Sequence, residues 1–140
     1  MNDMTKPSIF TQIRLGEIPG EVLFQDEHVF VVMTIAPHNP GHCLVIPIQE
    51  IADFEVLPTE IYSRLMSVAQ QIAQVQKQVY NSPKIALAAV GMSIDHVHIH
   101  VFPLYDETDI NTGRAQVVEL DKISPEADKI RTILMEAPIV

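Results

Sequence analysis

The sequence of 140 residues predicts one α+β domain, in which helices lie to one side of a five-stranded antiparallel sheet. Short segments rich in β-branched and apolar residues, bounded by turn residues, indicate the strands. Tight turns between the first strands favour antiparallel pairing, because parallel neighbours need a long crossover. A long stretch with apolar residues at helical spacing predicts one long helix, and two shorter helices are expected near the chain ends.

The first third of the chain predicts a short helix followed by three strands. Ser8 can cap a helix over residues 9–15, and Gly16 can end it. The turn at residues 26–28 and the Pro- and Gly-rich loop at residues 37–41 separate the strands. The three strands are expected at residues 21–25, 29–34 and 42–47.

The remainder predicts the long helix, two more strands and a tail. The long helix is expected from Pro58 to about Tyr80, with an apolar stripe of Ile61, Leu65, Val68, Ile72 and Val79. Two further strands follow at residues 84–90 and 96–103. Residues 117–120 could add a short strand, and Ser124 followed by Pro125 has the signature of a helix start, with the helix ending near residue 136. The domain core is expected at residues 8–104, with a tail over residues 105–140.

Composition and charge exclude several classes of function. The formal net charge of −9 disfavours nucleic acid and acidic membranes as partners. No apolar run approaches the roughly 20 residues that cross a bilayer, and no secretory signal is visible, so we expect a cytoplasmic protein without a membrane partner. Cys43 is the only cysteine, which leaves no intrachain disulfide.

Three histidines occupy alternate positions of the last predicted strand. His96, His98 and His100 should therefore share one face, while the aliphatic residues between them face the helices. An imidazole titrates near neutral pH, acts as an acid or a base, and is nucleophilic when neutral. Neighbouring imidazoles lower one another's proton affinity, which keeps the attacking ring neutral. The pattern predicts attack on phosphorus through a phosphohistidine-type intermediate.

Three other interpretations of the cluster remain open. Alternate histidines on a strand can chelate a metal, although few carboxylates or thiols lie nearby to complete a site. The cluster could bind a ligand without catalysis. A purely structural role would require a separate buried partner for each ring. We expect no metal and no cofactor.

The sequence resembles the histidine-triad (HIT) superfamily over residues 8–104. Residues 96–102 match the motif His-φ-His-φ-His-φ-φ in full, where φ is a hydrophobic residue. Residues 16–19 read GEIP, which looks like a turn of that family. Residues 37–47 read PHNPGHCLVIP, which looks like the family's segment in which proline, glycine and histidine precede a strand ending in LVIP. The order and spacing of these three stretches carry the resemblance.

The resemblance implies a fold and a set of catalytic roles. The family fold is a five-stranded antiparallel sheet with a long helix, and subunits pair through that helix and the sheet edge as a homodimer. His98 would be the nucleophile, and His100 would contact the phosphate and assist the leaving group. The carbonyl of His96 would fix the nucleophile's tautomer, and His42 would complete the polar cluster. Ser93 would bind phosphate, or alternatively cap a turn.

The resemblance also implies a nucleoside site, with informative departures. Its apolar slot would contain Ile9, Phe10, Ile18 and Ile35, with Ile13 and Val32 as further candidates or ordinary core residues. Thr34 stands where many members carry an aspartate that binds the ribose hydroxyls, so hydrogen bonding to the sugar should differ. A zinc site with Cys-x-x-Cys at the first helix is not matched by residues 8–11, and Glu50 replaces its histidine. We therefore expect no structural zinc.

These observations predict a hydrolase of nucleoside phosphoramidates or related nucleotide phosphoesters, acting through a nucleotidyl-histidine intermediate. Histidine at position 100 resembles the hydrolase branch of the family, where transferases usually carry glutamine. The alternatives are a nucleotide-binding or sensing module with vestigial catalysis, and a dinucleoside polyphosphate hydrolase. The acidic segment at residues 105–114 should repel a polyphosphate and could favour a cationic leaving group. The expected partner is a small nucleotide or other phosphorylated substrate.

Overall fold

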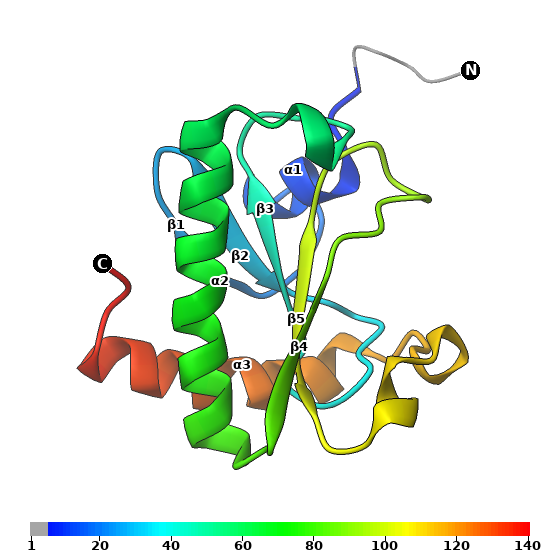
Figure 1. The fold of residues 1–140 in the computed structure, drawn as a ribbon, viewed down its shortest axis with the longest axis vertical. Coiled ribbons are helices and arrows are strands. Elements are labelled where there is room, and N and C mark those ends of the chain that lie inside the picture. Colours follow the sequence, from blue (N-terminus) through cyan, green and yellow to red (C-terminus); the bar gives the residue numbers. More distant parts are fainter. Residues whose placement is uncertain (1–5) are drawn as a thin grey trace.

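The structure, a computed structural model, describes residues 6–140 and contains a five-stranded antiparallel sheet in the order β1-β2-β3-β5-β4. This confirms the predicted fold class. The helices are α1 (Ile9–Arg14), α2 (Thr59–Tyr80) and α3 (Leu120–Glu136), and short 3-10 turns lie at Phe54–Val56, Glu107–Ile110 and Thr112–Arg114. The strands are β1 (Val22–Gln25), β2 (Val29–Met33), β3 (Cys43–Pro47), β4 (Lys84–Ala88) and β5 (Ile99–Leu104) (Figure 1).

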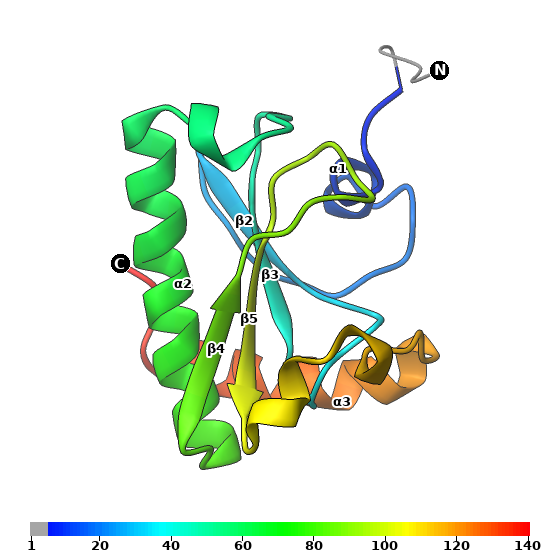
Figure 2. The ribbon, with the colours of Figure 1, turned by 45° about the vertical axis from the view of Figure 1, so that its right-hand side comes forward.

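The two faces of the sheet bury different apolar clusters, because side chains alternate along each strand. α2 packs on one face, where its residues Leu65, Val68 and Ile72 meet Val31 and Val45 of the central strands. α1 lies on the other face (Figure 2). That face has a smaller cluster of Phe10, Phe30, Val32, Leu44 and Ile46. The smaller cluster leaves room for a site beside it.

The long helix follows the predicted stripe, and α3 adds to the same core. Ile123, Ala127 and Ile130 of α3 are buried with the α2 cluster. Within residues 6–140 no helix is long and apolar enough to cross a membrane. Through these buried side chains of α3, the C-terminal tail packs against the core of the domain.

The structure corrects the predicted boundaries of α3. The helix begins at Leu120, one turn before Ser124, and it has 17 residues instead of being short. The one hydrogen of the Ser124 hydroxyl lies between two acceptors, a Glu21 carboxylate oxygen at 2.7 Å and the Leu120 carbonyl oxygen at 3.1 Å, and Ser124 does not cap the helix. Residues 117–120 form no strand. One hydrogen bond, from the Val118 N–H to the Ile35 carbonyl oxygen at 2.8 Å, ties this segment to the sheet.

The histidine segment is also less regular than predicted. β5 begins at Ile99, so His96 and His98 precede the strand, and β4 ends at Ala88. The Val97 N–H donates to the Ile51 carbonyl oxygen at 2.8 Å. The backbone before β5 therefore bonds to the loop after β3 instead of to a neighbouring strand.

Candidate active site

A cavity of about 480 Å³ opens on the α1 face of the sheet. His98, His100 and Ser93 line it together with all the residues predicted for the nucleoside slot, which are Ile9, Phe10, Ile13, Ile18, Val32, Thr34 and Ile35. Its wall is mostly apolar, and the two imidazoles are its titratable groups. Such a cavity, with a few polar groups at one end, is the usual form of a small-molecule site.

The ring of His98 is held in one tautomer. Its Nδ1 lies 2.8 Å from the carbonyl oxygen of His96. A carbonyl oxygen only accepts hydrogen bonds, so Nδ1 carries the proton and Nε2 keeps a free lone pair. Burial lowers the pKa of His98 below its ordinary value, although the bond to His96 opposes this. His98 is therefore a neutral imidazole with a nucleophilic nitrogen, 8% exposed beside the cavity.

A chain of hydrogen bonds gives His100 the opposite arrangement. The backbone N–H of His38 donates to Nδ1 of His42 at 3.0 Å, so the proton of a neutral His42 lies on Nε2. That Nε2 is 2.9 Å from Nδ1 of His100, which must accept. A neutral His100 therefore carries its own proton on Nε2. We call this series of hydrogen bonds, from the His38 N–H through His42 to His100, the histidine relay.

Burial and mutual repulsion keep the histidine relay neutral. Burial, and then the neighbouring imidazoles, lower the pKa of His42 to about 2 and that of His100 to about 4. The rings of His98 and His100 lie 5.0 Å apart between centroids. The site thus presents a lone pair on one ring and an N–H donor on the next, which suits nucleophilic attack beside a developing negative charge.

The prediction that three imidazoles line an open surface is wrong for His96. Its side chain is 0% exposed and does not line the cavity. Its Nε2 lies 2.7 Å from the Pro47 carbonyl oxygen, and its Nδ1 lies 2.5 Å from the hydroxyl of Ser8. The same hydroxyl accepts from the N–H of Thr11 and caps α1. His96 therefore joins α1 to the end of β3, and its carbonyl meets His98.

Two other predicted residues present hydroxyl groups to the cavity. Ser93 is exposed at its wall, and within residues 6–140 its hydroxyl makes no hydrogen bond that would support a role as a turn cap. The hydroxyl oxygen of Thr34 accepts from the N–H of Ala36 at 3.1 Å, which leaves its own hydrogen for a further partner. Met92, 87% exposed, lies at the same cavity and was not predicted.

Sequence reasoning missed Gln76, which holds the loop before His42. Gln76 is fully buried in α2, and its amide donates to the carbonyl oxygens of Gly41 at 2.9 Å and Val101 at 2.8 Å. It therefore fastens residue 41 to β5, directly beside the histidine relay. Its position four residues after Ile72, within the apolar stripe, was the available signal.

Within the acidic segment after β5, Asp109 has a structural role that was not predicted. Asp109 is 3% exposed and accepts hydrogen bonds from the side chain of Asn39 and the N–H of Tyr105, both at 2.9 Å. Arg114 pairs with Asp109 and donates to the carbonyl oxygen of His38 at 2.7 Å. These groups fasten the loop that carries the His38 N–H, so Asp109 is not available to attract a cationic leaving group.

The described part of the chain holds no group of three or more His, Cys, Asp or Glu side chains arranged to bind a metal ion. The Cys43 thiol is buried, and burial raises its pKa to about 12. The reactive groups at the cavity are thus the two imidazoles and the hydroxyls.

The chain is similar to known proteins in both sequence and structure. The family model for the HIT domain matches residues 15–107. An uncharacterised HIT-like protein of Methanocaldococcus jannaschii is 32% identical over 124 residues, covering 84% of this chain and 96% of that protein. Adenosine 5′-monophosphoramidase of Saccharomyces cerevisiae is 30% identical over 118 residues, covering 82% and 75%. The crystal structure of a HIT-like protein from Bartonella henselae superposes with a TM-score of 0.80 at 25% identity, covering 89% and 94%. The chain therefore belongs to the HIT family.

Proposed function

We propose that this protein hydrolyses the bond between the phosphorus of a nucleoside monophosphate and an amine or oxygen leaving group, with His98 as the nucleophile. One observation carries the proposal. At a single cavity, His98 offers an unprotonated Nε2, and the histidine relay leaves a proton on Nε2 of His100. A nucleophile beside a hydrogen-bond donor is what substitution at phosphorus requires.

The proposed reaction has two steps. Nε2 of His98 forms a bond to phosphorus, and the bond from phosphorus to the leaving nitrogen or oxygen breaks. The Nε2–H of His100 donates a hydrogen bond to the leaving atom as negative charge develops on it. Water then attacks phosphorus, which releases His98 and yields the nucleoside monophosphate. Overall, water supplies the oxygen gained by phosphorus and the proton gained by the leaving group.

The walls of the cavity support a nucleotide as the substrate. Ile9, Phe10, Ile18 and Ile35 would contact a nucleobase, because a planar apolar ring system is favourably buried against such side chains. Ser93 is available to bind a phosphate oxygen, and Thr34 lies where the sugar would pass. His96 would act as a positioning residue, holding the tautomer of the nucleophile through its carbonyl.

The names of the relatives support the same class of reaction. Besides the yeast phosphoramidase, a bis(5′-adenosyl)-triphosphatase of Dictyostelium discoideum is 28% identical over 123 residues. We therefore keep dinucleoside polyphosphate hydrolysis as a second candidate activity. Both activities would use the same attack by His98 and differ only in the leaving group.

We also propose that the protein is a homodimer. β4 is an edge strand of the sheet and has one unpaired side. Leu87 within β4 is 49% exposed, and Tyr62 of α2 and Phe54, whose rings contact one another, are 41% and 46% exposed. Burying these side chains against a second copy would remove apolar surface from water. Light scattering of the purified protein at several concentrations tests this, and a monomeric mass throughout would refute it.

The proposed activity is tested with adenosine 5′-phosphoramidate and diadenosine triphosphate, with release of AMP measured by chromatography. His98→Ala should lower the rate by several orders of magnitude while the protein stays folded. His28→Ala is the matched control, since His28 lies outside the cavity and pairs with Glu60. A covalent nucleotidyl adduct, detected by mass spectrometry after rapid quenching, should be present in the native protein and absent from His98→Ala.

Each outcome selects one function. Faster cleavage of the phosphoramidate supports the leading proposal, and faster cleavage of the dinucleotide supports the second candidate. Binding of AMP without turnover above the His98→Ala background would leave a nucleotide-binding module with vestigial catalysis and refute both activities.

A further inference from the structure

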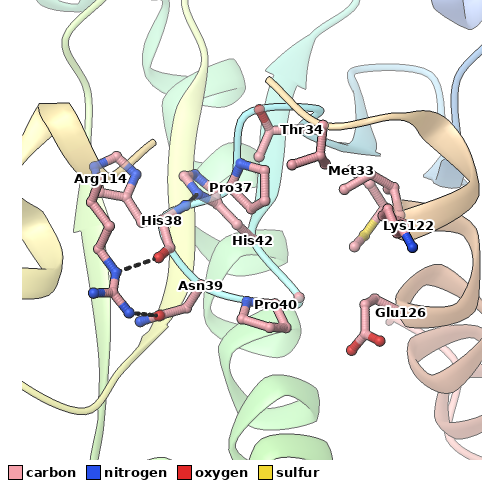
Figure 3. Close-up of a pocket in the computed structure, with 13 residues that line it drawn as sticks. Met33, Thr34, Pro37, His38, Asn39, Pro40, His42, Arg114, Lys122 and Glu126 are labelled. Carbon is pink, nitrogen blue, oxygen red and sulfur yellow. Dashed lines mark hydrogen bonds between the residues drawn. The ribbon is translucent and has the colours of Figure 1, made fainter. Parts of the chain in front are cut away.

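A second cavity of about 390 Å³ adjoins the first, and it lies between the loop at residues 37–42 and α3 (Figure 3). Met33 and Thr34 line both cavities, so the two spaces lie next to one another at these residues. Arg114 and Lys122 stand on opposite sides of the second cavity in Figure 3. We infer that this cavity is a subsite for a phosphate group carried on the sugar of the bound nucleotide. The inference rests on the proposed function, because it assumes a nucleotide in the first cavity.

The charges around the second cavity favour an anion. Arg114 is paired with Asp109, and Glu126 is paired with Lys129 at 3.1 Å. The remaining charge is the ammonium group of Lys122, which forms no ion pair or hydrogen bond with any residue in the range 6–140. The chain has 9 basic and 18 acidic residues, so few side chains could supply a positive charge to a cavity. The ammonium group suits a ligand that brings a negative charge.

Thr34 supplies a hydrogen-bond donor at the boundary between the cavities. Its oxygen already accepts from the Ala36 N–H, so its O–H is left to donate. A carboxylate at this place would accept from free sugar hydroxyls and repel a phosphate. A hydroxyl instead can donate to a phosphate oxygen. In dinucleotide-binding folds the same chemistry separates the two cases, because an acidic residue binds a free ribose hydroxyl and a basic residue accommodates a phosphate there.

The covalent structure of a nucleotide decides which group can reach the subsite. In the proposed complex the 5′-phosphorus lies at His98, and the base lies along the apolar wall formed by Phe10 and Ile18. The sugar joins these two parts, and its remaining attachment points are the 2′ and 3′ oxygens. A substituent there would pass over Thr34 toward Lys122. The substrate class is therefore a nucleotide with a second phosphate at its 2′ or 3′ position.

Calorimetry on the full chain tests the subsite with AMP, adenosine 2′,5′-bisphosphate and adenosine 3′,5′-bisphosphate as probes. At least one bisphosphate should bind roughly tenfold more tightly than AMP, as expected for a new hydrogen bond to a charged group. Lys122→Gln should abolish that advantage, and Lys122→Arg should retain most of it. Lys122 is exposed, so these variants should fold. Lys77→Gln, at an exposed position of α2 outside both cavities, makes the same change in net charge and should leave it unchanged.

The outcomes separate this inference from the proposed function. Equal affinity for AMP and both bisphosphates would overturn the subsite and leave the proposed function standing. An advantage that survives Lys122→Gln, or that Lys77→Gln also removes, would overturn it as well. Failure of all three probes to bind would overturn both proposals together. Binding of a bisphosphate without AMP, lost in Lys122→Gln, would support the subsite and identify the class of nucleotide.

Discussion

Mild acid should destabilise this protein strongly, because its buried histidines are held neutral. The pKa of His42 is lowered from 6.5 to about 2 and that of His100 from 6.5 to about 4. Between pH 6.5 and these values the unfolded chain binds a proton at each position and the folded protein does not. The stability that depends on the neutral rings is therefore fully present above pH 6.5. It is lost progressively as the pH falls toward the folded-state pKa values.

The size of the effect follows from proton linkage. Each such histidine removes about 1.4 kcal/mol of unfolding free energy per pH unit, so two remove about 2.7 kcal/mol per unit. Between pH 6.5 and 5 the loss would be about 4 kcal/mol, a large share of the roughly 5–15 kcal/mol of a typical domain. Burial also lowers the pKa of His38, His96 and His98, which changes stability in the same direction.

Urea unfolding followed by circular dichroism at pH 7, 6 and 5 measures this slope. Carboxylates with lowered pKa values, such as Asp26 and Glu21, titrate mainly below pH 5 and do not interfere. His42→Gln removes one of the two titrating rings and should make the pH dependence clearly shallower, whatever its effect on stability at pH 7. A slope below about 1.4 kcal/mol per pH unit between pH 6 and 5 in the native protein would mean uptake of less than one proton and would refute the reasoning.

Three further substitutions, at Gly41, Gly16 and Ser8, test the turns and the helix cap of the fold. Gly41 has φ of +89°, and a Cβ there would overlap the ring of Tyr80, so Gly41→Ala should lower the unfolding free energy by about 2–4 kcal/mol in urea titrations. Gly16 has φ of +80° and open space around it, so Gly16→Ala should cost only about 1 kcal/mol, and equal costs would contradict the steric argument. Ser8→Ala removes the cap of α1 and leaves Nδ1 of His96 without its partner, which should cost about 2–3 kcal/mol in thermal or urea unfolding. A cost below 1 kcal/mol would show that His96 does not depend on this hydroxyl.

Patterns within short stretches of sequence predicted most elements of the fold. The stripe of apolar residues located α2, and the turn residues around the first strands located β1, β2 and β3. Local patterns were less informative where the backbone bonds to distant segments. The start of α3 was misplaced because Ser124 bonds to the helix carbonyl of Leu120 and to Glu21 instead of capping. The start of β5 was misplaced because Val97 pairs with Ile51.

The role of individual polar residues was harder to predict than the fold. Asp109 was predicted to belong to an acidic segment that could favour a cationic leaving group, but it is bound to Asn39, which lies 70 residues away in the chain. Gln76 reaches Gly41 across 35 residues. Such partners come together only after the sheet has formed, so sequence spacing holds no record of them.

The sequence alone determined the α+β architecture and the cluster of alternate histidines, because periodicity and strand alternation are local properties of the chain. The apolar residues that line the cavity were predicted from the resemblance to the HIT family. The tertiary structure decided which nitrogen of each histidine carries a proton. That depends on the carbonyl of His96 and on the contact between His42 and His100, which are separated by 58 residues. It also decided that His96 is enclosed and that α3 brings Lys122 beside Thr34. These features arise from the packing of distant segments, and a short sequence motif contains no information about that packing.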